Sequence, residues 1–391
     1  MTDALKNKTV VDIEAIKSAM KRSAVLLCLE CGKCSSTCPV ALANPNFSPR
    51  QIVSRTITGG GISLLDSELI WHCLTCRLCN ERCPSDVYFI DFIRSMRTIA
   101  EVKGAQVPCS HGGAIQSLMH LMTAPEMKQN RLEWLTDNLE TSSTSEYLLF
   151  VGCLPYYDAY FDELKLNSTN IARSAIRVLN KIGISPVVSN DERCCGHDLF
   201  WTGEDEIFSM LAKRNVEAIS KTGVKKIITT CAECFTTLKN IYPKFVDFPF
   251  EVTHFSKFIA ELPDDKKISF VSDGISATYH DPCRLSRHAN IIDEPRKVLN
   301  SINGFDLREM THSGKRSNCC GTSSWMNCNM YSKMLQAARL KEAKETGANL
   351  LITACPKCMI HFKCAQRDAK NADELAIEIK DLTEVISDAI I

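Results

Sequence analysis

Cysteines in two pairs of repeated motifs limit what this 391-residue chain can fold into more than any other feature. A short motif, Cys-x2-Cys-x2-Cys-x3-Cys-Pro, occurs twice with every cysteine displaced by 45 positions. Its members are Cys28, Cys31, Cys34 and Cys38, then Cys73, Cys76, Cys79 and Cys83. A longer motif joins one cysteine, a Cys-Cys-Gly and a Cys-x-x-Cys. Its two copies are Cys153, Cys194, Cys195, Cys231 and Cys234, then Cys283, Cys319, Cys320, Cys355 and Cys358.

The longer repeat extends beyond its cysteines. Residues 221–230 (KTGVKKIITT) and 345–354 (ETGANLLITA) share a pattern at an offset of 124 positions, which indicates duplication of a folded unit. Apolar periodicity predicts alternating strands and helices in each copy, and hence small α/β units with metal-binding loops at strand ends. The expected strands are 147–151, 226–229, 277–280 and 350–353, and the expected helices are 171–182, 207–220, 295–302 and 330–345.

The stretch between the two short motifs is predicted to be helical. Ser48 supplies an N-cap before Pro49 and Gln51, and Gly59 to Gly61 should end that helix. Ser85 is expected to cap a second amphipathic helix that stops at Gly104. The predicted division is a helical domain (1–104), a linker with one short helix (105–145) and two homologous α/β domains (146–262 and 263–391).

Composition excludes several classes of protein. Lysine plus arginine (46) equals aspartate plus glutamate (46), so no net charge favours nucleic acid or an anionic membrane. The first twenty residues lack the apolar core of a signal peptide, and no later run approaches the roughly 18 apolar residues of a membrane span. A cytoplasmic location is therefore expected, where abundant thiols favour metal binding over structural disulfides.

The short motif is typical of ferredoxins that hold cubane [4Fe-4S] clusters, in which the fourth cysteine commonly serves the other cluster. Its region resembles the α-helical ferredoxin domain of respiratory iron-sulfur subunits. That resemblance implies one cluster on Cys28, Cys31, Cys34 and Cys83, and another on Cys73, Cys76, Cys79 and Cys38. A pair of zinc sites is the alternative, although zinc favours four thiolates grouped as two pairs.

The longer motif supplies five thiolates, more than one tetrahedral metal or one cubane needs, and its adjacent cysteines cannot easily bind the same iron. Here the chain resembles the family defined by the Cys-Cys-Gly domain. That family contains heterodisulfide reductase and the iron-sulfur subunits of glycolate oxidase and anaerobic glycerol-3-phosphate dehydrogenase. Residues 20–103 resemble the small ferredoxin subunit of heterodisulfide reductase, and residues 146–366 its catalytic subunit, as in the fused form. The resemblance implies a noncubane [4Fe-4S] cluster on each complete five-cysteine motif.

The resemblance also implies a function. Reduction of a disulfide takes two electrons, and a pair of one-electron clusters suits that reaction. The implied activity is reduction of a disulfide such as that of coenzyme M and coenzyme B, as in methanogenesis. Electrons would come from a flavoprotein or a membrane cytochrome b in a hetero-oligomeric complex. Two alternatives stay open: an electron-transfer subunit for a flavin-dependent 2-hydroxy-acid or glycerol-3-phosphate dehydrogenase, and a redox partner acting on a disulfide of a small protein.

Several other side chains are weaker candidates. His197 and His280 are expected either to donate protons to departing thiolates or to hydrogen-bond to cluster sulfur. Cationic groups after Cys283 would attract an anionic thiol or form solvated surface; they are Arg284, Arg287 and His288. Cys328 is an extra thiol near the second cluster or a buried free cysteine, and Cys109 and Cys364 receive no role.

Overall fold

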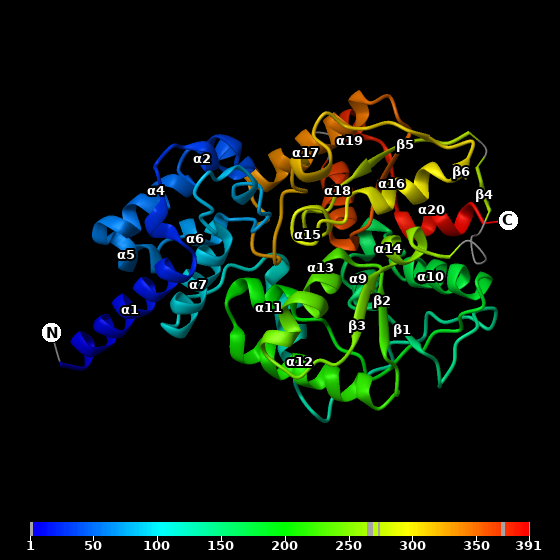
Figure 1. Cartoon of the computed structure of the whole chain (residues 1–391), viewed down its shortest axis with the longest axis horizontal. Coiled ribbons are helices and arrows are strands. Elements are labelled where there is room, and N and C mark those ends of the chain that lie inside the picture. Colours follow the sequence, from blue (N-terminus) through cyan, green and yellow to red (C-terminus); the bar gives the residue numbers. More distant parts are fainter. Residues whose placement is uncertain (1–2, 264–268, 273, 369–371, 391) are drawn as a thin grey trace. The chain divides into compact units, whose positions relative to one another are not determined.

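A computed structural model describes residues 3–263, 269–272, 274–368 and 372–390 (Figure 1). The chain forms two compact units. The amino-terminal unit contains residues 1–118 together with two later segments, 198–208 and 321–335. The carboxy-terminal unit contains residues 119–197, 209–320 and 336–391. In the described part of the chain, no helix combines the length and the apolar character that crossing a membrane requires.

The amino-terminal unit is built from helices around the two short cysteine loops. Its α-helices from this part of the chain are α1 (Asp3–Arg22), α2 (Lys33–Thr37), α3 (Pro39–Ala43), α4 (Pro49–Arg55), α5 (Gly61–Leu65), α6 (Leu69–His72), α7 (Phe89–Val102) and the start of α8 (Ala114–Leu121). Short turns complete it: η1 (Val25–Leu27), η2 (Thr56–Gly60), η3 (Asn80–Arg82) and η4 (His111–Gly113). The predicted helical character of this region is confirmed.

Three predicted helix signals have different outcomes. Ser48 caps α4 as predicted, because its side chain accepts a hydrogen bond from the backbone N–H of Gln51. Gly59 interrupts the helical run as predicted: its φ of 95° is not helical, the chain kinks there, and a separate helix, α5, begins at Gly61. Ser85 does not cap α7, whose N-cap is Tyr88 with no side-chain hydrogen bond, so that prediction was wrong.

A buried arginine ties α7 to the second cysteine loop. Arg97 has no exposed surface, and its guanidinium donates to the carbonyl oxygens of Ile70 (2.9 Å) and Cys73 (2.6 Å). Because an arginine stays charged and offers five fixed donors, it can hold several carbonyls in one arrangement. Arg97 therefore fixes the backbone where the loop begins, a role that the sequence analysis missed.

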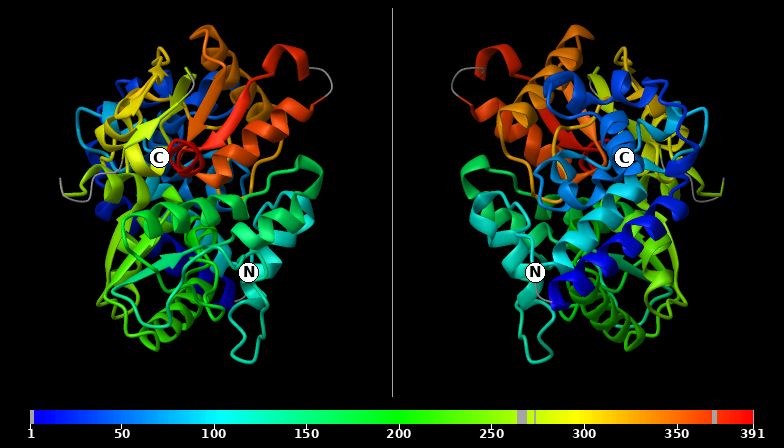
Figure 2. Two further views of the ribbon diagram at one scale, coloured as in Figure 1. Left: turned by 90° about the vertical axis from the view of Figure 1, so that its right-hand side faces the viewer. Right: turned by 90° about the vertical axis from the view of Figure 1, so that its left-hand side faces the viewer.

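The carboxy-terminal unit contains two halves with matching parallel sheets. The first half has the order β1 (Tyr147–Phe150), β2 (Lys226–Thr229) and β3 (Glu251–His254). The second has β7 (Asp306–Leu307), β5 (Ser276–His280), β8 (Leu350–Thr353) and β9 (Glu378–Asp381). In Figure 2 the orange β8 and the red β9 lie side by side, in agreement with their parallel register. A short pair, β4 (Phe270–Val271) and β6 (Ile302–Asn303), completes the strands of the described residues.

Helices surround these sheets and join the halves reciprocally. They are α9 (Leu154–Tyr160), α10 (Thr169–Lys181), α12 (Asp205–Ser220), α13 (Ala232–Thr236), α14 (Phe255–Ala260), α15 (Cys283–Ser286), α16 (Asp293–Asn300), α17 (Met330–Glu345), α18 (Pro356–Arg367), α19 (Ala372–Leu375) and α20 (Leu382–Asp388). The first residues of α12 and α17 belong to the amino-terminal unit, and so do most residues of α11 (His197–Thr202). The turns are η5 (Asp162–Leu164), η6 (Thr237–Ile241), η7 (Tyr242–Lys244) and η9 (Gly314–Arg316). The last helix of each half packs on the second helix of the other, α20 on α10 and α14 on α16.

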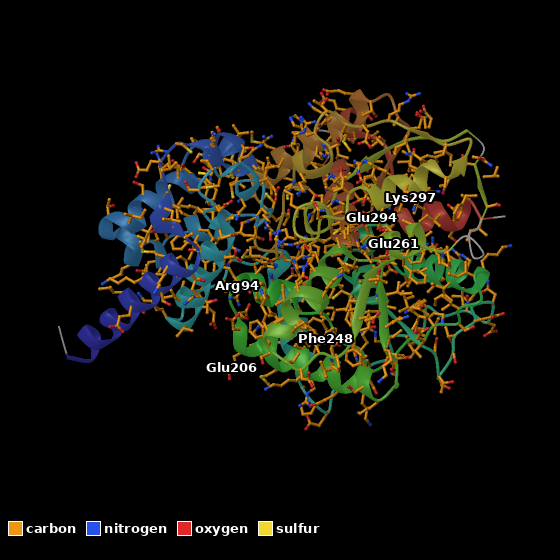
Figure 3. All side chains as sticks on the ribbon, in the orientation of Figure 1. Arg94, Glu206, Phe248, Glu261, Glu294 and Lys297 are labelled. Atoms are coloured by element: carbon orange, nitrogen blue, oxygen red, sulfur yellow. The ribbon has the colours of Figure 1, made fainter. Side chains whose placement is uncertain are left out.

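Polar contacts support the same seam. On one side Asn170 Nδ2 donates to Glu384 Oε1 (2.7 Å). On the other, Lys257 Nζ lies 3.2 Å from a carboxylate oxygen of Glu261 and 3.9 Å from one of Glu294, two residues labelled in Figure 3. The reciprocal packing makes the two halves face one another. The strands and helices predicted for the repeat are confirmed, with ends that shift by about two residues.

Candidate metal centres

The amino-terminal loops bring their eight cysteines together in two crossed groups. One cavity is lined by Cys28, Cys31 and Cys34 of the first loop and by Cys83 of the second. Cys79 also borders that cavity, which places the two groups next to one another. Burial raises the pKa of the Cys34 thiol, and the nearby thiols of Cys28 and Cys83 raise it further. The fourth cysteine of the second motif thus lies with the first three of the other.

The reverse holds for Cys38. Burial raises the pKa of its thiol, and its thiol neighbours are Cys76 and Cys73 of the second loop. Burial raises the pKa of the Cys79 thiol, and the neighbouring thiols of Cys73, Cys76 and Cys38 raise it further. The chain therefore offers two sets of four thiols, each with three members from one loop and one from the other.

The backbones of the two loops repeat one another closely. Glu30 and Thr75, displaced by 45 positions, both take a positive φ, 52° and 48°. Their amide groups donate to Cys28 Sγ and Cys73 Sγ, each at 3.4 Å. Residues other than glycine rarely adopt such φ angles, so these strained turns are of the kind found at functional sites. They aim peptide N–H groups at sulfur, as sulfur ligands of a metal cluster require.

The first long motif converges at the carboxyl ends of β1 and β2. Cys195 exchanges hydrogen bonds with the thiols of Cys194 and Cys234, and it also interacts with Cys231. Gly152, just before Cys153, has a φ of 65°, and a Cβ atom there would lie 3.0 Å from Cys234 Sγ. A larger residue would therefore fill the space beside this sulfur.

A buried ion pair fixes the Gly152 turn. Glu192 accepts hydrogen bonds from the backbone N–H groups of Gly152 (2.6 Å) and Val151 (3.1 Å), and Arg131 Nη2 lies 2.8 Å from its Oε1. Burial raises the pKa of Glu192 to about 7, although Arg131 and the two amides favour the charged form. The sequence analysis missed this pair because the two residues are 61 positions apart.

The second long motif converges on the sulfur of Cys320. The neighbouring thiols of Cys319 and Cys358 lower the pKa of the Cys320 thiol, and the histidines His280 and His361 beside it lower that pKa further. The distance from His361 Nδ1 to Cys320 Sγ is 3.5 Å. Cys283 begins α15 directly after β5. His280 thus lies against the second cysteine group, as one of its two predicted roles requires.

The two cysteine groups meet. Cys231 of the first motif and Cys355 of the second share a hydrogen bond between their thiols. Beside them, Lys357 Nζ lies 2.6 Å from Glu233 Oε2, so the residue before the last cysteine of each motif pairs with its counterpart. The Lys357 side chain is 3% exposed and that of Glu233 13%. A charge pair so shielded from water needs partners in place, because a lone buried charge is costly.

Arg284 and His197, two of the weaker candidates from the sequence, extend this network. Arg284 Nε donates to His197 Nε2 (2.9 Å), and His197 Nδ1 lies 3.4 Å from Glu233 Oε2. Arg284 and Arg287 are each 3% exposed, which excludes the alternative that they form solvated surface. His288 contacts Arg284 Nη1 through its Nε2 at 2.7 Å. His197 and Arg284 therefore belong to one buried polar network at the junction of the two motifs.

The remaining cysteines lie elsewhere. Cys328 is exposed, so the interpretation as a buried free thiol was wrong. Cys109 is also exposed, and Cys364 is half-buried. The donor sets of the other eighteen cysteines fit iron-sulfur clusters. All are sulfur, the loop cysteines gather in two sets of four, four cysteines of each CCG motif lie together, and Gly152 leaves space beside one sulfur.

Comparisons with known proteins agree with these groupings. Residues 24–87 match the family model of a 4Fe-4S dicluster domain, and residues 147–239 and 277–363 both match that of the cysteine-rich CCG domain. A solved structure of a hypothetical protein from Helicobacter pylori has a similar fold, with a TM-score of 0.51 at 11% identity over 88% of this chain and 68% of that one.

Curated relatives match along nearly the whole chain. The EtfAB:quinone oxidoreductase of Syntrophomonas wolfei is 26% identical over 92% of this chain and 57% of its own. One subunit of a fumarate reductase (CoM/CoB) from Methanothermobacter marburgensis is 28% identical over 92% of this chain and 71% of its own. One subunit of the dihydromethanophenazine:CoB-CoM heterodisulfide reductase from Methanosarcina barkeri is 31% identical over 93% of both chains. The chain therefore belongs to the heterodisulfide reductase family of iron-sulfur oxidoreductases, in the form that fuses a dicluster domain to two CCG domains.

Proposed function

We propose that this chain reduces a disulfide, the heterodisulfide of coenzyme M and coenzyme B or a similar one, at the junction of its two CCG motifs. One observation carries the proposal: the two five-cysteine groups meet through Cys231 and Cys355. A protein that only carries electrons needs no second five-cysteine group facing the first. A disulfide has two sulfur atoms, and two facing groups of thiolate ligands suit their separation into two thiols.

The proposed ligand sets follow the observed groupings. Two cubane clusters would be held by Cys28, Cys31, Cys34 and Cys83, and by Cys73, Cys76, Cys79 and Cys38. Two noncubane clusters would be held by Cys153, Cys194, Cys195, Cys231 and Cys234, and by Cys283, Cys319, Cys320, Cys355 and Cys358. When bound, these clusters would supply the one-electron transfers that a two-electron reduction needs.

The chain's own residues would hold the two motifs together and attract the substrate. The buried pair of Glu233 and Lys357 bridges the motifs, and Arg284 adds a second buried cation through His197. Around the cysteine sulfurs, the cations Lys357 and Arg284 outnumber the single carboxylate of Glu233. This excess favours a substrate with an anionic group, such as a sulfonate or a phosphate.

The overall reaction consumes a disulfide, two electrons and two protons and releases two thiols. We propose that a flavoprotein or a membrane cytochrome b supplies the electrons, and that the chain works in the cytoplasm, at the membrane where that partner resides. The related proteins from Methanosarcina are themselves named as subunits of a heterodisulfide reductase, which supports a hetero-oligomeric complex.

A second candidate is an electron-transfer subunit of a flavin-dependent dehydrogenase. The match over 92% of this chain to an EtfAB:quinone oxidoreductase supports it, since that protein is named for transfer from a flavoprotein to a quinone. In this candidate the two CCG groups would carry electrons without binding a substrate sulfur.

Electron paramagnetic resonance of anaerobically purified, oxidised protein separates the two candidates. Spectra are compared with and without the thiol of coenzyme M or coenzyme B. We expect a new paramagnetic species that depends on added thiol. An absent thiol response, with cubane signals present on reduction, would favour the electron-transfer subunit instead.

A further inference from the structure

The two halves of the carboxy-terminal unit are repeats, yet they differ at the strand end that precedes the first cysteine. Phe150 ends β1 opposite Thr229, and His280 ends β5 opposite Thr353. The strand registers make these two positions equivalent. The first cysteine group therefore has an apolar ring where the second has an imidazole.

The hydrogen bond to His280 fixes which of its nitrogens carries the proton. Arg339 Nε donates to His280 Nδ1 at 3.0 Å, inside a site where both residues are 1% exposed. A nitrogen that accepts a hydrogen bond carries no proton, so the proton of the neutral ring is on Nε2. The ring of Phe362 meets His280 edge to face at 4.9 Å and holds the plane of the imidazole.

Arg339 is itself held by acceptors other than His280. Its Nη1 donates to the carbonyl oxygen of His312 (3.0 Å) and to Glu342 Oε2 (2.6 Å), and its Nη2 donates to Ser317 Oγ (3.1 Å). An arginine does not give up its proton in proteins, so Nε remains a donor. The tautomer of His280 is thus set by a rigid neighbour and does not depend on the cysteines.

The free face of the ring points at sulfur. His280 Nε2 is buried and has no hydrogen-bond partner among the described residues, and His280 is one of the groups that lower the pKa of the neighbouring Cys320 thiol. A ring nitrogen of His280 and the sulfurs of Cys320 and Cys358 all lie within 4.8 Å of one another.

The first half lacks this arrangement at the equivalent positions. Asn215 lies 124 positions before Arg339. Its Oδ1 accepts from the Arg193 amide, and its Nδ2 donates to the Cys194 carbonyl oxygen and to the Tyr242 hydroxyl. The buried His254 uses both nitrogens locally: Nδ1 accepts from the Ser256 amide and Nε2 donates to the Thr230 carbonyl oxygen, each at 3.2 Å.

We propose that Arg339 and His280 are a positioning pair that gives the Cys320 sulfur a fixed N–H donor and makes the second CCG centre the more easily reduced of the two. This inference rests on the proposed function, in which both groups hold clusters. A hydrogen bond to a ligand sulfur stabilises the reduced, more negative state of a cluster and raises its reduction potential. The repeat would then hold two unequal centres, with electrons collecting first at the second.

The test uses the full chain, loaded with iron and sulfide under anaerobic conditions and titrated while its paramagnetic signals are recorded. His280→Phe places the residue of the first half in the second. We expect it to lower the midpoint potential of one noncubane centre and leave the other centre and the iron content unchanged. His280→Gln, which keeps an N–H group, should give a smaller shift. His120→Gln, an exposed histidine of α8, is the matched control and should give none.

Two results would overturn the inference. One is an unchanged midpoint potential in His280→Phe with full iron. The other is loss of iron from one centre in both His280 variants, which would make His280 a ligand. If His280→Phe fails to fold, pulsed resonance of wild-type protein with ¹⁵N-labelled histidine decides. His361 Nδ1 also lies 3.5 Å from Cys320 Sγ, so we expect two weak nitrogen couplings, of which His280→Gln removes one. A spectrum that His280→Gln leaves unchanged would contradict the inference. Wild-type protein with far fewer than about 16 iron atoms per chain would refute the proposed function separately.

Discussion

The amino-terminal cysteine loops and the carboxy-terminal CCG groups reach a similar result by different means. In the first loop, three cysteines lie within seven consecutive residues, and Cys31 is exposed. In the first CCG group, Cys195 and Cys234 are buried and come from segments about 40 residues apart. Local backbone turns position the loop cysteines, whereas the CCG cysteines depend on sheets, strand ends and buried charges. Changes to the core should therefore affect the CCG groups much more than the loops.

The largest effect is expected when a central CCG thiol is removed. Cys195→Ala should eliminate or disturb one noncubane centre, because Cys195 contacts Cys194 and Cys234 within its group. Iron analysis and resonance spectra would show the loss, while the cubane signals of the amino-terminal loops remain intact. Full iron, unchanged spectra and unchanged turnover would contradict the assignment of Cys195.

The crossed grouping of the loops predicts a loss of iron that depends on which cysteines are combined. Cys38→Ser should disturb the centre of the Cys73 loop, because the Cys38 thiol lies near Cys73 and Cys76. Adding Cys79→Ser should then remove little further iron, whereas adding Cys28→Ser should remove a second cluster. Iron and sulfide content of the three variants measures this. An equal loss in the two double variants would exclude the crossed arrangement.

A smaller effect is expected at the charge pair that bridges the CCG motifs. Lys357→Met leaves Glu233 buried without its ammonium partner and should lower the free energy of unfolding by about 3 kcal/mol. Urea unfolding under anaerobic conditions, followed through the cluster absorbance of the carboxy-terminal unit, would measure this free energy. The double variant Glu233→Gln with Lys357→Met removes both charges and should recover part of the loss. A double variant as unstable as the sum of the single ones would show that the pair is not coupled.

The smallest effect is expected at the cap of α4. Ser48→Ala removes the side-chain acceptor for the Gln51 amide and should cost about 1 kcal/mol of stability in the amino-terminal unit. Ser48→Asp, which keeps an acceptor, is the control. The midpoint of thermal unfolding, recorded with cluster absorbance, should fall for alanine only. Similar losses in both variants would point to packing and not to capping.

Much of the candidate site could be predicted from motif spacing, because thiols at fixed short intervals have few alternative uses. The polar network around them could not. Glu233 and Lys357 occupy matching places in their motifs, so their opposite charges were a signal that pairing across the repeat could have used. Arg339 gave no such signal, since its contact with His280 joins residues 59 positions apart.

Local signals for helix ends were right at Ser48 and Gly59 and wrong at Ser85. Ser85 has the composition of an N-cap, yet α7 begins at Phe89, after Tyr88. Gly59 does interrupt the helical run, because a φ of 95° suits glycine and does not fit a helix.

The sequence by itself determined the inventory: a dicluster motif, a duplicated five-cysteine motif, and the alternation of strands and helices that carries it. These follow from spacing and periodicity, which are properties of the chain alone. The tertiary structure decided which group of thiols the fourth cysteine of each loop joins. It also decided that the two CCG groups meet, and that His280 lies near sulfur where Phe150 stands in the other half. Such facts depend on the approach of distant strand ends, which reciprocal helix packing fixes and no local pattern encodes.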